Sequence, residues 1–294
     1  MKEIRQKVFN EERALYGSRD LIVADCVFES GESPIKECRD LELTGSLFCY
    51  KYPIWYSENI KVTGCTWYEM ARAGVWYNKN VTINDAVIQA PKNFRRCTGL
   101  KLCDVVFTNA EETLWHCDGV ELKNVSAKGH YFAMNCSNMD VDGLTLDGNY
   151  SFDGVKNAVI RNSRLLTKDS FWNSENVTVY DSFVSGEYLG WNSRGLTLIN
   201  CTVESSQGMC YAEDIKLVNC RLIDTTLAFE YSTVDAEIVN RAESIFDPAG
   251  GRIKAESIGE LIVEPDRVDP AKIEIECPDV QKRSEKIDWK NVKI

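Results

Sequence analysis

The side chains best suited to chemistry lie near the middle of the chain. His116 and Asp118 have the types and spacing of a general base with a carboxylate beside it, and Arg96 could hold a substrate carboxylate such as that of a uronic acid. We take these three as candidate catalytic residues, for a reaction of the glycoside hydrolase or polysaccharide lyase kind. A His–Asp pair on a protein surface is usually solvated and inert, so a non-catalytic role for these residues is the alternative. The candidate ligand-binding residues on the same face are Tyr56, Tyr77, Lys92, Arg95, Trp115, Asn135, Asn173, Trp191 and Asn192.

A sequence repeat places these side chains at equivalent positions. An Asp, Asn or Gly marker precedes each short apolar alternation, and the gaps between markers are 20, 19, 21, 19 and 20, then five of 19. The second and fourth residues of each repeat are apolar and the third is mostly polar, which indicates a half-buried strand. The markers are Asp20, Asp40, Asn59, Asn80, Gly99, Gly119, Asn138, Asn157, Asn176, Gly195 and Asp214.

A sharp turn is expected at the sixth position of every repeat. That position is always Asp, Asn or Gly, the residue types that best tolerate positive φ. A second short strand follows, and stacking of such units gives parallel strands on successive coils. We therefore predict an all-β, single-stranded, right-handed parallel β-helix of about 11 regular coils of about 19 residues.

One domain is expected over residues 1–294. Residues 1–19 would cap the first coil, 20–233 form the regular coils, and 234–277 form irregular coils and a second cap. The charged segment 278–294 would be a tail.

Two other solenoids compete with this prediction. A leucine-rich repeat would need Leu three residues before Leu196, where this chain has Ser193. A left-handed hexapeptide helix would show a six-residue subperiod, and the sequence has none.

Composition restricts the partners and the compartment. The formal net charge of −11 argues against nucleic acid. The N-terminal MKEIRQKVFNEERALYG lacks the apolar region of a signal peptide and no long apolar run follows, so we expect a cytoplasmic protein without a membrane partner. The oligomeric state stays open.

Twelve cysteines raise the question of a metal site. Cys97, Cys117 and Cys136 fall on consecutive coils and could ligate a metal. They occupy repeat positions otherwise filled by small residues, so buried thiols are the favoured interpretation. We expect no metal and no cofactor.

Five of the seven tryptophans lie four residues before a marker: Trp55, Trp76, Trp115, Trp172 and Trp191. Strand parity would put them in the core and turn the residues three and five before each marker outward. A kink would instead make the tryptophans an external stripe suited to stacking on sugar rings. The Tyr and Asn residues of this face could also form only a ladder of contacts between coils.

Three segments resemble an uncharacterised bacterial family of small pectin-lyase-like β-helix proteins: SFWNSENVTVYDS (170–182), GEYLGWNS (186–193) and AFEYSTV (228–234). The resemblance implies a single-stranded right-handed β-helix and no particular activity. More distant relatives of that family are polysaccharide hydrolases and lyases. Their sequence motifs are missing here. One of them is Gly-His-Gly, whereas Gly129-His130 in this chain is followed by Tyr131.

The sequence leaves two functions open. The first is a carbohydrate-associated protein that binds or cleaves an oligosaccharide along its outward face. The alternative is a non-catalytic scaffold or protein-interaction solenoid.

Overall fold

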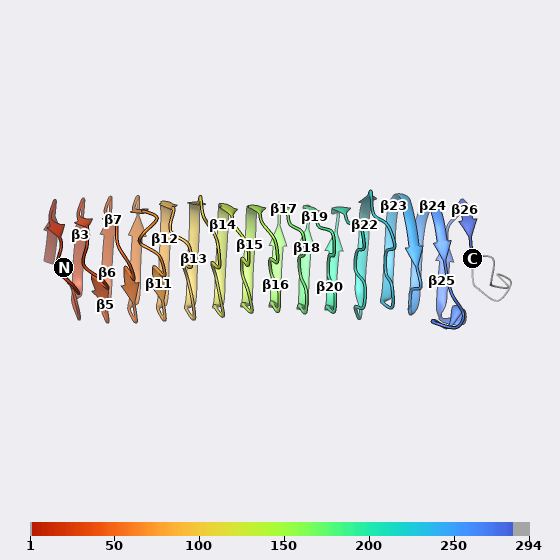
Figure 1. Ribbon diagram of the computed structural model, residues 1–294, viewed down its shortest axis with the longest axis horizontal. Coiled ribbons are helices and arrows are strands. Elements are labelled where there is room, and N and C mark those ends of the chain that lie inside the picture. The colour runs from red at the N-terminus through yellow and green to blue at the C-terminus, as the bar shows by residue number, and fades with distance from the viewer. Residues whose placement is uncertain (1, 285–294) are drawn as a thin grey trace. The chain divides into compact units, whose positions relative to one another are not determined.

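The computed structural model describes residues 2–284. Two compact units divide the chain, Met1–Gly148 (unit 1) and Asn149–Ile294 (unit 2). Each unit is a stack of parallel strands with almost no helix (Figure 1). The predicted all-β parallel β-helix is therefore confirmed.

Unit 1 contains three columns of strands. The first column pairs in parallel from one coil to the next and consists of β1 (Lys2–Arg5), β3 (Arg19–Ala24), β6 (Arg39–Thr44), β9 (Glu58–Thr63), β12 (Lys79–Ile88), β13 (Thr98–Phe107), β14 (Asp118–Lys128) and β15 (Ser137–Asp147). The second consists of β2 (Val8–Phe9), β4 (Val27–Phe28), β7 (Leu47–Phe48) and β10 (Thr66–Trp67), after which the longer strands continue through the corner. A separate sheet holds β5 (Ile35–Lys36), β8 (Ile54–Trp55) and β11 (Val75–Trp76). Residues 2–9 thus form a first coil of their own, and a turn follows at residues 11–17.

Unit 2 repeats the arrangement and then departs from it. Its first column is β16 (Lys156–Arg161), β18 (Glu175–Tyr180), β20 (Arg194–Ile199), β22 (Ile215–Ile223), β23 (Thr233–Phe246), β24 (Gly250–Ile262) and β25 (Ile273–Glu276). The second is β17 (Arg164–Leu166), β19 (Phe183–Ser185) and β21 (Thr202–Glu204), and β26 (Val280–Arg283) pairs with β24. The pairing of β23 with β22 and with β24 contains register shifts, and a short 3₁₀ helix, η1 (Pro270–Lys272), precedes β25. The predicted tail lies outside the described residues from 285 onward.

The turns occur where the sequence predicted them. Every marker and every sixth position has positive φ, for example 54° at Asn200 and 51° at Asn219. The Asn200 amide donates to Asp181 Oδ1 at 3.0 Å, and the Asn219 amide donates to Asn200 Oδ1 at 2.8 Å. The corners of successive coils therefore stack directly, as the repeat requires.

These amide ladders often begin at an aspartate. In unit 1 the Asn59 amide donates to Asp40 at 2.8 Å, and the Asn80 amide donates to Asn59 at 3.1 Å. In unit 2, Asn173 donates to Asp153 and Asn192 donates to Asn173, both at 2.8 Å. Each amide donates toward the preceding coil and leaves its own oxygen for the next one.

The interior is a stack of apolar side chains at equivalent positions. In unit 1 the rings of Phe9, Phe28, Phe48 and Trp67 stack with centroids 4.7 to 5.0 Å apart and are almost fully buried. Identical positions on coils about 4.8 Å apart bring planar rings into contact without further adjustment.

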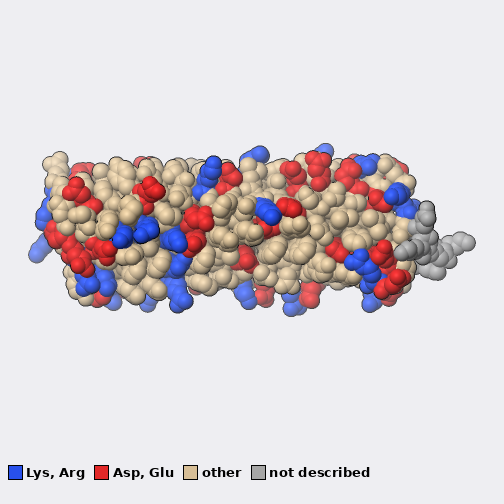
Figure 2. Space-filling model, viewed as in Figure 1, with Lys and Arg blue, Asp and Glu red and all other residues tan. Residues whose placement is uncertain are grey.

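Charged side chains of both signs are interspersed on the visible surface (Figure 2). Neighbouring coils pair them, as in Lys61–Glu42 at 3.3 Å and Lys101–Glu121 at 2.8 Å. Exposed ion pairs of this kind contribute little to the free energy of unfolding.

Nine of the twelve cysteines are buried, and Cys49, Cys103 and Cys277 are partly exposed. All twelve are free, and Cys97, Cys117 and Cys136 are at most 1% exposed, each with its Sγ directed at a backbone carbonyl. Burial raises the pKa of the Cys38 and Cys65 thiols to about 11. Such thiols are poor nucleophiles at neutral pH.

The part of the chain that the structure describes has no helix with the length and hydropathy of a membrane span.

Candidate functional site

The tryptophans form outward columns, so the prediction from strand parity is wrong. Trp55, Trp76 and Trp115 are partly exposed, whereas the residues just before them, such as Val75 and Leu114, are fully buried. The physical reason is a kink at positive φ: the residue after each tryptophan has φ between 52° and 61°. All five indole N–H groups donate to a backbone carbonyl of the following coil.

The flat faces of the unit 1 column are already covered. Trp55 stacks on Trp76 at 5.1 Å, and the Arg95 guanidinium lies between the rings of Trp76 and Trp115, 4.5 and 4.6 Å from their centroids. A sugar that stacks on an aromatic ring needs one open face. Both faces of Trp76 and one face each of Trp55 and Trp115 are covered in this way, so the column gives little support to the sugar-stacking hypothesis.

The predicted catalytic residues are placed close together but are not paired with one another. Arg96, His116 and Asn135 are exposed at the same repeat position on three successive coils, all with positive φ. Asp118 Oδ1 accepts hydrogen bonds at 2.6 Å from Ser137 Oγ and from the Asn138 amide, and these bonds lower the pKa of its carboxyl. Asp118 is therefore engaged with the next coil and not with His116.

The other candidate residues of unit 1 hold neighbouring coils together. Lys92 and Arg95 both pair with the Glu112 carboxylate, at 3.0 and 3.2 Å. Tyr56 and Tyr77 stack on each other at 4.8 Å with their rings nearly parallel. These contacts favour the interpretation of this face as a ladder between coils.

The three candidate residues of unit 2 behave in the same way. Asn173 and Asn192 belong to the ladder that begins at Asp153. Trp191 stacks on Trp172 with centroids 5.7 Å apart.

A polar groove in unit 2 is the feature that sequence reasoning missed. It has a volume of about 500 Å³ and lies beside β17, β19 and β21. Its lining is dominated by hydroxyl, amide and charged groups from Asn149, Leu166, Thr167, Lys168, Ser185, Gly186, Glu187, Glu204, Ser205, Ser206 and Asp224.

The groove carries an excess of negative charge. Lys168 Nζ lies 3.7 Å from Glu187 Oε2, a weak pair because both groups are partly exposed. Within the described residues, Glu204 and Asp224 have no ion-pair partner. Their carboxylate oxygens are thus open to hydroxyl or cationic groups of a ligand.

A buried carboxyl lies next to the groove lining. Asp169 is 3% exposed, and its Oδ1 has no hydrogen-bond partner among residues 2–284. Burial raises the pKa of Asp169, and the nearby Glu187 adds to the rise while Lys168 opposes it. Beside it, the hydroxyls of Thr167, Ser170 and Ser151 form a chain with O···O distances of 2.5 and 2.7 Å.

A weak sequence signal for the groove exists. Thr167, Gly186 and Ser205 follow the second strand of three successive coils at a spacing of 19, and unit 1 has Ala90, Ala110 and Gly129 there, so a small residue alone does not mark the groove. A Cβ at Gly186 would lie 3.1 Å from the carbonyl oxygens of Thr167 and Lys168, so little space for a larger side chain exists there.

A family profile described as "Protein of unknown function (DUF3737)" matches residues 2–276. The chain belongs to the DUF3737 family. The resemblance to an uncharacterised family is thereby confirmed, and the finer description as pectin-lyase-like stays a prediction.

No curated protein matches this DUF3737 protein. The crystal structure of PfbA, a surface adhesin of Streptococcus pneumoniae, is similar over 91% of this chain and 72% of that chain, with 9% identity and a TM-score of 0.25. A similarity of that degree carries no inference about function.

Proposed function

We propose that this protein binds a neutral, hydroxyl-rich ligand of the oligosaccharide class in the unit 2 groove. The observation that carries the proposal is the pair of carboxylates, Glu204 and Asp224, which line the groove without a cationic partner among the described residues. Carboxylates accept strong hydrogen bonds from hydroxyl groups. Two adjacent hydroxyls of a sugar can both donate to one carboxylate. The groove volume of about 500 Å³ lies within the range of small-molecule sites.

The charge of the groove selects among ligands. One lysine faces three carboxylates in the lining, so an anionic ligand would be repelled. The lining also has few apolar groups, which argues against a hydrophobic ligand. A uronic acid would therefore bind less well here than the matching neutral sugar.

Cleavage of the ligand would require a proton donor, and Asp169 is our candidate. Its carboxyl is buried beside the lining residue Lys168 and has a raised pKa. Carboxyls of that kind serve as general acids in glycoside hydrolysis.

A scaffold without a ligand is the second candidate, favoured by the closed columns of unit 1. There, Arg95, Trp115, Tyr56 and Tyr77 are engaged with neighbouring coils. A protein whose surface side chains only join coils would bind no glycan.

The two candidates are distinguished by thermal unfolding of the purified protein with a panel of neutral and uronic oligosaccharides. We expect at least one neutral oligosaccharide to raise the unfolding midpoint by a few degrees, because a ligand that binds only the folded state stabilises it. Glu204→Gln and Asp224→Asn should each reduce that shift. The matched control Glu69→Gln changes an exposed glutamate of unit 1 and should leave the shift intact.

A shift that survives in both groove variants would place the ligand elsewhere and contradict the proposal. A panel without any shift would favour the scaffold. Release of reducing ends, abolished by Asp169→Asn, would add cleavage to binding.

A further inference from the structure

Two buried carboxylates lie at equivalent positions on adjacent coils of unit 2. Glu230 is 5% exposed and Asp247 is fully buried. Backbone bonds from Tyr211 N to Glu230 O, at 2.7 Å, and from Tyr231 N to Asp247 O, at 2.9 Å, show that both continue the position that tryptophan holds elsewhere. Buried carboxylates are costly unless a cation and hydrogen-bond donors satisfy them.

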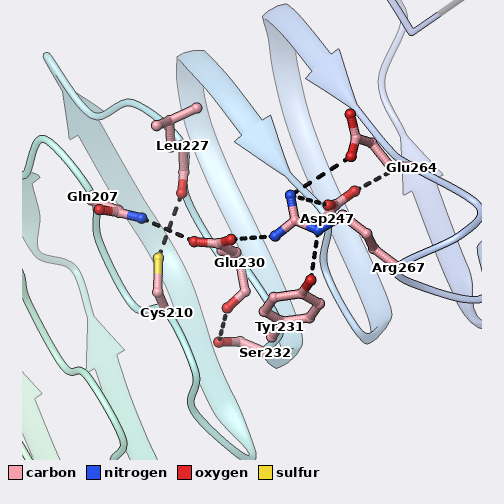
Figure 3. Close-up of polar contacts among 9 residues, drawn as sticks. All are labelled: Gln207, Cys210, Leu227, Glu230, Tyr231, Ser232, Asp247, Glu264 and Arg267. Carbon is pink, nitrogen blue, oxygen red and sulfur yellow. Dashed lines mark hydrogen bonds and ion pairs between the residues drawn. The ribbon is translucent and has the colours of Figure 1, made fainter.

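A single guanidinium satisfies both. Arg267 Nη2 donates to Glu230 Oε1 at 2.6 Å, Nη1 lies 3.1 Å from Asp247 Oδ2, and Nε donates to the Tyr231 hydroxyl at 2.6 Å (Figure 3). The guanidinium also lies 4.9 Å from the Tyr231 ring centroid and 4.8 Å from that of Phe246. All three nitrogens and the flat face of the group are therefore recognised.

The coils build this site independently of the arginine that fills it. The Gln207 amide donates to Glu230 Oε2 at 2.9 Å and thereby orients the carboxylate (Figure 3). Asp247 Oδ2 has no hydrogen-bond partner among the described residues and faces the guanidinium across 3.1 Å. Arg267 belongs to the connection between β24 and β25, where Pro265, Asp266 and Asp269 are exposed.

The site also keeps an excess of negative charge when it is filled. Glu264 Oε2 is a third carboxylate, 3.7 Å from Arg267 Nη1, so one cation faces three anions. An ammonium group has no planar fork and cannot match Glu230, Asp247 and the ring faces at once.

We propose that Glu230, Tyr231, Phe246 and Asp247 form a guanidinium-binding site, which Arg267 fills as an intramolecular ligand and which an alkylguanidinium from solution fills when Arg267 is removed. Arginine side chains are the form in which proteins supply this group. In the natural chain Arg267 occupies this site and ties the β24–β25 connection to Glu230, Tyr231 and Asp247.

The test is chemical rescue of Arg267→Ala, followed by thermal unfolding. The variant should unfold at a lower temperature than the natural chain, because two buried carboxylates lose their cation. Methylguanidinium or arginine amide at millimolar concentration should raise its unfolding midpoint by several degrees. Methylammonium and urea at the same concentration should not, and the natural chain should respond to none of the four.

Two further variants decide the outcome. Arg267→Gln keeps a polar side chain of intermediate size and takes the place of Arg267→Ala if that protein does not fold. The double variant Glu230→Gln/Arg267→Ala should lose the preference for methylguanidinium. Equal effects of methylguanidinium and methylammonium, or a preference that persists in the double variant, would overturn the proposal.

Discussion

Units 1 and 2 place different chemistry at the same backbone position. At the position of the tryptophan columns, unit 1 has Trp55, Trp76, Arg95 and Trp115, whereas the last coils of unit 2 have Cys210, Glu230 and Asp247. In unit 1 the cation belongs to the column and an acid from outside it, Glu112, balances it. In unit 2 the acids belong to the column and Arg267 comes from outside.

The comparison shows that coil geometry alone does not select a residue type. Each position only requires that its side chain find an interaction partner on the coils above and below. Rings do this by stacking, amides by hydrogen bonds, and charges by an opposite charge. A site can therefore arise in a solenoid of constant backbone by substitution at one column.

The largest expected effect comes from breaking the unit 1 column at its cation. Arg95→Ala removes a guanidinium from between two indole rings and leaves Glu112 with Lys92 alone. We expect a loss of about 2 kcal/mol in the free energy of unfolding, measured by urea denaturation. Arg95→Trp should recover more than half of it, because an indole fits this position on neighbouring coils. Equal losses in both variants would mean that the ion pair, and not stacking, holds the column.

A smaller effect is expected at the sixth repeat position, where unit 1 has Gly45 and Gly64 and unit 2 has Asn200. Asn200→Ala removes hydrogen bonds to Asp181 and Asn219 and forces a Cβ onto φ of 54°. The cost should be about 1–2 kcal/mol. Asn200→Gly loses the same bonds without the backbone strain and should unfold at a higher urea concentration than the alanine variant. The reverse order would contradict a left-handed corner.

The smallest effect is a gain of stability beside the groove. Asp169→Asn removes a buried carboxylate that lacks a hydrogen bond, and should stabilise the protein by about 1 kcal/mol at pH 7. The folded-state pKa of Asp169 is raised, so the natural protein loses stability as the pH rises through that pKa. Below the unfolded-state pKa, near 3.8, both proteins are neutral at residue 169 and should be equally stable. Urea midpoints from pH 3 to 7 check this, and a constant difference across the range would contradict it.

The coil could be predicted from the sequence because its turns require particular residue types. Positions such as Asp181 and Asn200 accept only residues that tolerate positive φ, and this restriction repeats at a fixed period. The orientation of the tryptophans could not be predicted by parity. Phe94 and Leu114 also have positive φ, at 55° and 62°, and their residue types give no sign of it.

The sites were harder to predict than the coil. The groove is lined by Glu204 and Asp224, which have no ion-pair partner among the described residues, and no local pattern predicts that property. The Arg267 cluster joins residues 37 positions apart, after the period has broken. His116 and Arg96 were singled out by residue type, and their roles stay predictions.

The ladder of side-chain amides has a direction, because every amide donates toward the preceding coil. A carboxylate can only accept hydrogen bonds, so an aspartate such as Asp40 or Asp181 can stand at the start of the series. Each asparagine after it donates its amide to the preceding coil and can accept from the following one. A coil added after the last asparagine of such a series could donate its own Asn amide to the oxygen that this residue leaves unused. The order Asp, Asn, Asn at intervals of 19 to 21 residues thus gives the direction in which the amides of the ladder donate.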